Sequence, residues 1–387
     1  VASTAVQPTR QVATGTGLAG GGDLSADRTI TLTQAAQDSL AKADKSVQSV
    51  NGVAPDATGN VTVSSTTATP RLGIIHVASS QAPAPVKAQA EYVCDGTDDQ
   101  EQINLALKDA SRPVDGFGGI GAGMVQLVGG DFFCHHDNAT SITMYPATWL
   151  RGAGHGMLIQ PRWTTDQDRG CIELIDAATA QARVSDVSIG RPAGNTSRGH
   201  GIKWVQSGTA NTREIATGQD PFLWVDNVMI HKPSRCGIAL SGTNSGARET
   251  QISNVLVWDS RGNAFDIASS DCRITSCTSQ PAADSTTGVG GHGFRIAGGN
   301  VKLANCKSYY SEKDSDGFYL ESARVELTGC AAQDNGRHGF NFASTTDVTC
   351  AGLVADSNSR TNTGGAGFNI ASSGVYEGLH AFDRGQT

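Results

Sequence analysis

The chain has 387 residues, of which 17% are charged, 6% are aromatic and 47 are glycine. A glycine share well above the usual ~7% predicts frequent turns and short elements instead of long helices. The formal net charge of −8 argues against the basic surface that nucleic-acid binding requires. The sequence also contains no apolar run of about 18 residues that could span a membrane.

The first 70 residues differ in composition from the rest of the chain. Turns rich in Gly, Asp and Asn separate short Thr/Val strands at 14–33 and 46–64, and residues 33–47 between them predict a helix. Its thin apolar seam would be marginal in a lone helix. We therefore predict that residues 1–70 form a fibrous segment that is ordered by sharing its core with other chains. The seam consists of Ala36, Leu40, Ala43 and Val47.

Residues 94–110, CDGTDDQEQINLALKDA, predict an amphipathic helix near 97–110. Asp98 and Asp99 suit the N-terminus of this helix, where carboxylates interact favourably with free backbone N–H groups. The apolar face of the helix would comprise Ile103, Leu105, Ala106 and Leu107.

One short phrase then returns along the chain, as in HGFNF at 338–342. A small residue is followed by a large apolar one, a polar one and a second apolar one, and this alternation is typical of a strand with one buried face. The first apolar column is Ile202, Ile238, Phe265, Phe294, Phe318, Phe340 and Phe368. The second column is Trp204, Leu240, Ile267, Ile296, Leu320, Phe342 and Ile370.

A second phrase alternates with the first. Its two apolar columns lie three residues apart, and the residue before the second column is always Asp, Asn, Ser or Gly. These types tolerate a left-handed backbone, so a tight bend is predicted between two short strands. The first column is Val184, Val225, Ile252, Ile274, Leu303, Leu327, Cys350 and Tyr376. The second column is Val187, Val228, Val255, Cys277, Cys306, Cys330, Leu353 and Leu379.

Repeats of about 22–29 residues with two or three short strands each indicate a β solenoid, in which the members of a column stack across successive coils. A leucine-rich repeat is the rival solenoid, but it needs a helix in each repeat, and no helical periodicity lies between these strands. We predict an all-β fold, a parallel β-helix over residues 71–387 with the helix near 97–110 as its cap. The nine cysteines are expected to be reduced and buried as small apolar side chains.

The helix at 94–110, the glycine-rich strand after it and the LRGAG turn at 150–154 resemble the start of the pectate-lyase-like right-handed parallel β-helix of phage tailspikes. The resemblance covers about residues 71–387, while the strand phrases within residues 1–70 resemble short modules of phage tail-fibre proteins. It implies a tail fibre or tailspike, a minor tail protein of the distal virion that is extracellular during attachment. It also implies an intertwined homotrimer that docks to other tail proteins through its N-terminal segment.

The resemblance leaves the chemistry open, because such β-helices include polysaccharide lyases, glycoside hydrolases and adhesins. A hydrolase needs two carboxylates at a fixed separation, and the best candidates are Glu312 and Asp334, with Asp314 and Asp316 in the loop of Glu312. Acidic turn residues are also ordinary on the surface of an acidic protein. The loop crowds its acids with Lys313 and several hydroxyls, so we expect the carboxylates to stay hydrated and ionised, and we predict no cleavage.

Exposed aromatic side chains are predicted to lie on one outer face, where they suit carbohydrate recognition through ring contacts and hydrogen bonds. The predicted glycan-binding residues are Trp258, Tyr309, Tyr310 and Glu312. Packing against a loop or another copy of the chain is the alternative explanation for these aromatics. An outward column places Tyr310 one coil from Asp334; its members are Lys232, Asp259, Pro281, Tyr310, Asp334 and Ser357.

Histidines precede the glycine of three repeats, but these repeats are not consecutive, so we expect solvated corner residues and not metal ligands. They are His200, His292 and His338. The neighbouring His135 and His136 would point to opposite faces of a strand. The glycine-rich segments 17–23 and 152–156 lack the continuation of a phosphate-binding loop. We predict no metal site and no cofactor.

The sequence thus favours a trimeric virion component that adheres to host envelope polysaccharide without cutting it. A depolymerase on the same β-helix and a purely structural tail-tip protein remain as alternatives. The repeat pattern still continues at Leu379 and Ala381 with no capping helix after it. Since terminal coils of solenoids need caps, we expect the chain to continue beyond Thr387 or another chain to cover its last coil.

Overall fold

A computed structural model of the chain describes residues 10–44, 73–111, 123–134, 140–145, 147–175, 182–190, 199–205, 223–240, 249–281, 291–312, 314–360 and 364–382. The chain divides into two compact units, Val1–Thr69 and Pro70–Thr387. Within the described ranges, no helix has both the length and the apolar character needed to cross a membrane.

Within its described residues, 10–44, the first unit has two small antiparallel strand pairs and one helix. The pairs are β1 with β3 and β2 with β4, and the helix α1 lies within the predicted span 33–47, of which residues 45–47 are outside the described residues. Its elements are β1 (Gln11–Val12), β2 (Leu18–Ala19), β3 (Gly22–Asp23), β4 (Thr31–Leu32) and α1 (Gln34–Asp44). Leu40 in the predicted seam is 53% exposed, and Leu18 and Leu32 are also more than 40% exposed. Coverage of these side chains by other copies stays a prediction, and the second strand phrase, 46–64, lies outside the described residues.

The second unit begins with elements that build the start of a solenoid. They are β5 (Ile74–Ala78), α2 (Ala84–Lys87), β6 (Tyr92–Val93), α3 (Gln100–Ala110), β7 (Gly123–Val128) and β8 (Phe132–Cys134). The helix α3 buries Ile103, Ala106 and Leu107 against the first coils, whereas Leu105 is 53% exposed, so Leu105 was wrongly placed on the apolar face.

Asp99 precedes α3 but does not cap it through its side chain. Its buried carboxylate instead accepts hydrogen bonds from the backbone N–H groups of Gly96 (2.8 Å) and Phe133 (2.7 Å). Burial raises the pKa of this carboxyl above its usual value, despite these two bonds. Asp99 thus stands at the N-terminus of the helix as predicted, but its carboxylate binds the backbone of β8 instead of the first N–H groups of the helix.

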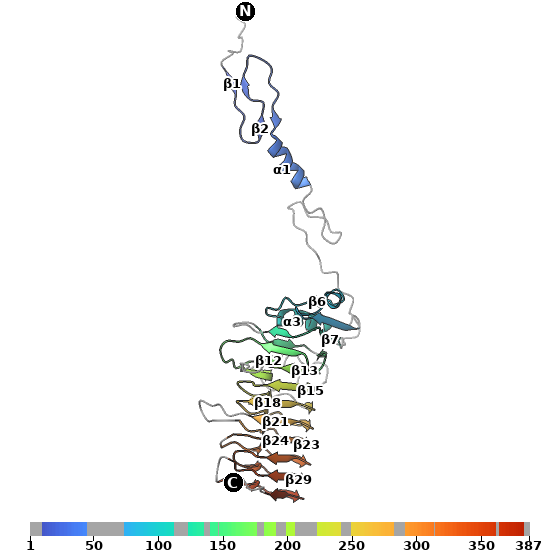
Figure 1. Cartoon of the computed structure of the whole chain (residues 1–387), viewed down its shortest axis with the longest axis vertical. Helices are drawn as coiled ribbons and strands as arrows, with labels where there is room; N and C mark the ends of the chain where they lie inside the picture. The colour runs from blue at the N-terminus through green and yellow to red at the C-terminus, as the bar shows by residue number, and fades with distance from the viewer. Residues whose placement is uncertain are drawn as a thin grey trace, which may run out of the picture. The chain divides into compact units, whose positions relative to one another are not determined.

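The remaining strands form coils with three flanks, and all their pairings from one coil to the next are parallel. In Figure 1 the strands of this unit stack in order from β12 to β29. The first flank contains β10 (Thr148–Arg151), the first halves of β13 (Ala182–Ile189) and β15 (Leu223–His231), β17 (Gln251–Ser253), β20 (Arg273–Thr275), β23 (Lys302–Ala304), β26 (Glu326–Thr328), β29 (Val348–Ala351) and β32 (Gly374–Glu377).

The second flank follows the first across a bend. It contains β11 (Leu158–Pro161), the second halves of β13 and β15, β18 (Leu256–Ser260), β21 (Thr278–Pro281), β24 (Lys307–Tyr309), β27 (Ala331–Gln333), β30 (Val354–Asp356) and β33 (His380–Phe382). The third flank is a separate sheet. It contains β9 (Ile142–Met144), β12 (Gly170–Ile175), β14 (His200–Val205), β16 (Ile238–Leu240), β19 (Phe265–Ile267), β22 (Phe294–Ile296), β25 (Phe318–Leu320), β28 (Phe340–Phe342) and β31 (Phe368–Ile370).

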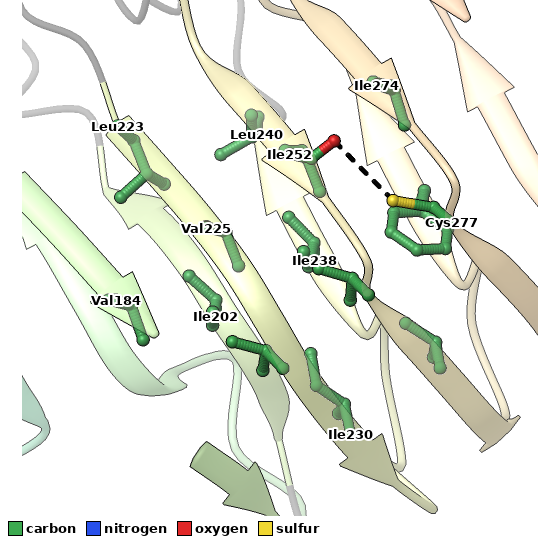
Figure 2. Close-up of a cluster of buried hydrophobic side chains, with 14 of the residues drawn as sticks. Val184, Ile202, Leu223, Val225, Ile230, Ile238, Leu240, Ile252, Ile274 and Cys277 are labelled. Atoms are coloured by element: carbon green, nitrogen blue, oxygen red, sulfur yellow. Dashed lines mark hydrogen bonds between the residues drawn. The ribbon is translucent and has the colours of Figure 1, made fainter. Parts of the chain in front are cut away.

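The strand register confirms the predicted columns. The chain of partners from Val184 to Tyr376 follows the predicted order on the first flank, and the partners from Ile202 to Phe368 do so on the third. Figure 2 shows Val184, Val225, Ile252 and Ile274 side by side in successive coils. Parallel pairing in register therefore places side chains of one type above one another, as the repeated phrases predict.

The bend between the first and second flanks also has the predicted backbone. All eight residues before the second column have φ between 53° and 64°, in the left-handed region; they are Asp186, Asn227, Asn254, Ser276, Asn305, Gly329, Gly352 and Gly378. Two further left-handed ladders were not predicted. One precedes the first flank, at Glu249, Asp271, Asn300, Arg324 and Asp347, and the other follows the second flank, at Lys232, Asp259, Tyr310, Asp334 and Ser357.

Pro281 does not belong to this last ladder, contrary to the prediction. Its partner is Ser260 and not Asp259, because the register between β18 and β21 shifts after Trp258. The pyrrolidine ring fixes φ near about −65°, so proline cannot take the left-handed position that the other coils use there. Asp259 therefore has no counterpart in the strand that ends at Pro281.

Aromatic rings and thiols fill the interior. Phe265, Phe294, Phe318, Phe340 and Phe368 stack with neighbouring ring centroids 4.5–5.2 Å apart. All nine cysteines are free and buried, as predicted. The thiol of Cys277 lies 3.7 Å from the carbonyl oxygen of Ile252 in the preceding coil, the contact drawn as a dashed line in Figure 2.

The histidines before the repeat glycines are not simply solvated corner residues: His200 is buried, whereas His292 and His338 are partly exposed. The Nδ1 atom of each accepts a backbone N–H from the next coil: His200 from Cys236 (3.2 Å), His292 from Asp316 (3.0 Å) and His338 from Ala366 (3.0 Å). Burial lowers the pKa of all three imidazoles, which favours the neutral form that can accept this bond. They are structural acceptors at the corner of the coil.

Candidate functional site

The predicted site residues lie on the outward side of the second flank. One outward column runs through successive coils. Trp258 pairs with Gln280 of the next coil, and Tyr309, in the coil after Gln280, pairs with Gln333. Trp258 is 40% exposed and Tyr310 is 43% exposed. The structure therefore places the aromatic residues on one face, but Trp258 lies two coils away from the tyrosines.

The left-handed conformation of Tyr310 turns the chain immediately after β24 and directs two consecutive aromatic side chains outward. The rings of Tyr309 and Tyr310 meet edge to face, with centroids 5.6 Å apart and planes at 71°. The Nζ atom of Lys307 lies 5.3 Å from the Tyr309 ring centroid. Burial, with the neighbouring Tyr310 and Asp259, raises the pKa of the Tyr309 hydroxyl, which is therefore a neutral donor at physiological pH.

Arg360, from the following coils, joins the tyrosine pair to the acidic residues. Its guanidinium carbon lies 5.4 Å from the Tyr310 ring centroid, and one of its terminal nitrogens lies 3.3 Å from a carboxylate oxygen of Glu312. Its Nε donates to the backbone carbonyl of Asp334 at 3.1 Å. We call Tyr309, Tyr310, Glu312 and Arg360 the tyrosine–arginine cluster.

The two predicted acid candidates both contact Arg360, but in different ways. Glu312 uses its carboxylate, whereas Asp334 uses its backbone carbonyl, and Asp334 as a residue is only 9% exposed. An acid that transfers a proton to a glycosidic oxygen must be able to hold that proton. Since the carboxylate of Glu312 is engaged by the guanidinium of Arg360, this geometry suits binding better than proton transfer.

Asp316 has a structural position and is not part of this surface. Its side chain is fully buried and accepts hydrogen bonds from Arg337 Nε (2.7 Å), from the His338 backbone N–H (3.0 Å) and from Asn341 (2.8 Å). Burial alone would raise the pKa of Asp316, but these bonds outweigh it and lower the pKa below its ordinary value. The prediction that the acids of this loop are all hydrated is therefore wrong for Asp316, although Asp316 is ionised as expected.

Two asparagines, the buried Asn335 and the partly buried Asn358, hold the backbone beneath the tyrosine–arginine cluster. Asn335 accepts the Ser311 N–H (3.2 Å) and donates to Asn358 (2.8 Å), and Asn358 donates to the Ala332 carbonyl (3.0 Å). This ladder positions the loop that carries Tyr310 and Glu312, so the cluster rests on a rigid coil.

Sequence reasoning missed Arg360. Its contact with Asp334 spans 26 residues, about the length of one coil. Extension of the outward column by one coil beyond Asp334 could therefore have predicted that Arg360 lies close to the candidate acids. The part of the chain that the structure describes contains no group of three or more His, Cys, Asp and Glu side chains arranged to hold a metal ion. His135, His136 and Asp137 lie outside the described residues.

Comparison with protein families gives one match, in which the model of the right-handed β-helix region covers residues 215–381. Residues 215–381 thus match a right-handed β-helix region, in agreement with the parallel coils of the second unit. A comparison with curated protein sequences finds no match.

Three solved structures are similar to this chain to different degrees. The enzymatically active domain of tailspike protein 2 from bacteriophage CBA120 has a TM-score of 0.56 at 16% identity, over 74% of this chain and 41% of that domain. Full-length tailspike protein 2 from Escherichia coli O157:H7 bacteriophage CAB120 has a TM-score of 0.54 at 15% identity, over 74% and 37%. The A-module of mannuronan C-5 epimerase AlgE4 from Azotobacter vinelandii has a TM-score of 0.49 at 13% identity, over 75% and 95%.

The chain thus spans about two fifths of the length of the tailspike domain that it matches. At these identities the likeness concerns the fold of the right-handed β-helix and not its activity.

Proposed function

We propose that the protein is a phage tail fibre or tailspike component that binds host envelope polysaccharide through the second flank and does not cleave it. The observation that carries this proposal is the tyrosine–arginine cluster, which presents exposed ring surface beside a paired guanidinium and carboxylate. Sugars bind to such surfaces because their apolar faces contact aromatic rings while their hydroxyls bond to planar polar groups. The β-helix shared with a phage tailspike domain supports the setting in the distal tail of the virion.

The proposed assembly is a homotrimer that docks to other tail proteins through residues 1–70. The exposed Leu18, Leu32 and Leu40 of the first unit support it, because apolar side chains on so small a unit are stabilised by burial against another chain. A trimer would present three copies of the second flank, and weak individual sites would then gain avidity. Light scattering of the full chain tests this directly, and a monodisperse monomer would contradict it.

The binding proposal is tested with the full chain on an array of bacterial capsular and O-antigen polysaccharides. We expect one class of polysaccharide to bind, and Tyr310→Ala to weaken that binding up to about tenfold, the value of one lost ring contact. Phe382→Ala is the matched control, because Phe382 is also 43% exposed and lies in the outward column of Tyr309, three coils away.

A depolymerase is the second candidate, since the tailspike domain that shares the fold is described as enzymatically active. Incubation of the full chain with the bound polysaccharide, followed by assays for new reducing ends and unsaturated products, decides between the two. Product formation that is lost in Glu312→Gln or Asp334→Asn would establish the depolymerase. Absence of binding to every polysaccharide would favour a purely structural tail-tip protein.

A further inference from the structure

A hollow of about 270 Å³ opens on the first flank, away from the tyrosine–arginine cluster. Its lining comes from three consecutive coils, on β13, β15 and β17. The inward neighbours of these residues, Val184, Val225 and Ile252, belong to the core in Figure 2, so the hollow rests on a packed surface. It is lined by Arg183, Trp224, Val225, Asp226, Gln251 and Ser253.

Arg183 and Trp224 form one wall of the hollow, and Trp149 supports Arg183 from the preceding coil. Trp149, Arg183 and Trp224 follow one another in one outward column. The guanidinium carbon of Arg183 lies 4.3 Å from the ring centroid of Trp149, whose Nε1 donates to Ser185 at 2.8 Å and thereby fixes the ring. Trp224 is 38% exposed, so ring surface is open to a ligand.

The polar groups of the hollow retain hydrogen-bonding capacity. One carboxylate oxygen of Asp226 accepts bonds from Ser253 (2.6 Å) and Asn254 (3.1 Å). The other oxygen lies 3.9 Å from the nearest nitrogen of Arg183, which is beyond hydrogen-bond length. Arg183 is held by its stacking on Trp149 and not by a close ion pair, and the Gln251 side chain is exposed.

The charge along this outward column is positive although the chain as a whole is acidic. After Trp224 and Gln251 the column continues with Arg273 and Lys302, and the first carboxylate in it is Glu326. Lys302 pairs with Glu326 at 2.8 Å, whereas Arg273 is exposed and forms no ion pair with any residue that the structure describes. Two weakly paired guanidiniums thus flank Trp224, one coil before it and two coils after it, about 5 and 10 Å away at the usual strand spacing.

We propose that this hollow is a second saccharide site, specific for an acidic sugar such as a uronic acid. The sugar ring lies against Trp224, its hydroxyls bond to Asp226 and Gln251, and its carboxylate pairs with the guanidinium of Arg183 or Arg273. Arginine suits this role because its planar fork binds a carboxylate through two parallel hydrogen bonds. The inference goes beyond the proposed function, since it concerns another flank and a defined sugar chemistry.

The test uses the full chain and the methyl glycosides of glucuronic, galacturonic and mannuronic acid, each beside the methyl glycoside of its neutral hexose, with binding followed by NMR. We expect at least one uronide to bind in the millimolar range and its neutral partner about tenfold more weakly, the difference that one hydrogen bond to a charged group makes. Trp224→Ala should abolish uronide binding. Either Arg183→Met, which keeps the contact with Trp149 without the charge, or Arg273→Met should remove the preference for the uronide, and the variant that does so identifies the arginine that binds the carboxylate; retention of the preference in both variants would contradict the inference.

Phe382→Ala is again the matched control and should leave uronide binding unchanged, and circular dichroism verifies that each variant is folded. Failure of all three uronides to bind, or equal binding of acidic and neutral sugars, would overturn the inference. So would a change of oligomeric mass in Trp224→Ala, because the flank would then be a contact between copies of the chain. The two proposals fail separately: Tyr310→Ala tests the second flank with polysaccharide, and Trp224→Ala tests the hollow with uronides.

Discussion

The stack of phenylalanine rings on the third flank predicts how much one interior side chain contributes to the stability of the coils. Phe318 is fully buried and stacks on Phe294 and Phe340, with both centroid distances 4.7 Å. Truncation of a buried Phe to Ala typically lowers the free energy of unfolding by about 3–5 kcal/mol. Phe318→Ala should fall at the upper end, because two ring contacts of about 0.5–1.5 kcal/mol each are also lost.

Phe368 provides the comparison within the same column. It is only partly buried, and among the residues that the structure describes its one stacked ring neighbour is Phe340, at 5.2 Å. Phe368→Ala should therefore cost about 1–2 kcal/mol, the part of the full effect that partial burial and one contact allow. Phe318→Leu, which keeps most of the apolar volume without the ring, should also cost about 1–2 kcal/mol.

The assay is urea unfolding of the full chain followed by circular dichroism, with comparison of midpoints at an unchanged slope. A cost of Phe318→Ala equal to or below that of Phe368→Ala would refute the reasoning. It would mean that the rings do not contribute through stacking between neighbouring coils.

Three further predictions follow from the bends, the corner histidines and the thiols. Asn305 has φ of 54°, so Asn305→Val should cost about 1–2 kcal/mol in urea unfolding while Asn305→Gly costs a few tenths; equal effects would contradict the left-handed bend. The pKa values of His292 and His338 are lower in the folded chain than in the unfolded chain, so on acidification the unfolded chain is protonated first. The contribution of these histidines to the free energy of unfolding is therefore complete above pH 6.5 and is lost as the pH falls through their pKa values in the folded chain. The melting temperature should therefore fall on acidification, and it should fall less in the double variant His292→Asn/His338→Asn. Asparagine is a suitable replacement because Asn263, at the corresponding position of another coil, already accepts the equivalent backbone N–H, that of His292. Identical pH profiles of the two proteins would contradict this. Hydrogen bonding with Cys277 and burial raise the pKa of Cys306 to about 12, so Ellman's reagent should label the folded chain slowly and the urea-unfolded chain fast.

Much of the fold could be predicted from the sequence, because a parallel solenoid repeats the same environment in every coil. The columns from Val184 to Tyr376 and from Ile202 to Phe368 recur as similar apolar residues, and the bend residues recur as types that accept a left-handed backbone. The pattern distinguishes inward from outward positions. It therefore predicted the core and the face that carries Tyr309 and Tyr310.

The contacts of outward side chains could not be predicted in the same way. Whether Arg360 reaches Glu312 depends on the length and path of the turn before it, and a repeat pattern does not encode that path. The histidines were misassigned because a corner position was taken to be solvated, whereas the next coil supplies a buried N–H donor there. Pro281 was misaligned because counting residues along the chain assumes an unbroken register, whereas the register between β18 and β21 shifts by one residue after Trp258.

The central claim is that the second flank binds an envelope polysaccharide without cutting it, and one measurement tests it most directly. The full chain is incubated with the polysaccharide selected on the array, and bound ligand, reducing ends and unsaturated products are measured on the same sample. The account predicts saturable binding that Tyr310→Ala weakens and Phe382→Ala does not, with no product over time. Product that accumulates with the full chain and is lost in Glu312→Gln or Asp334→Asn would contradict it.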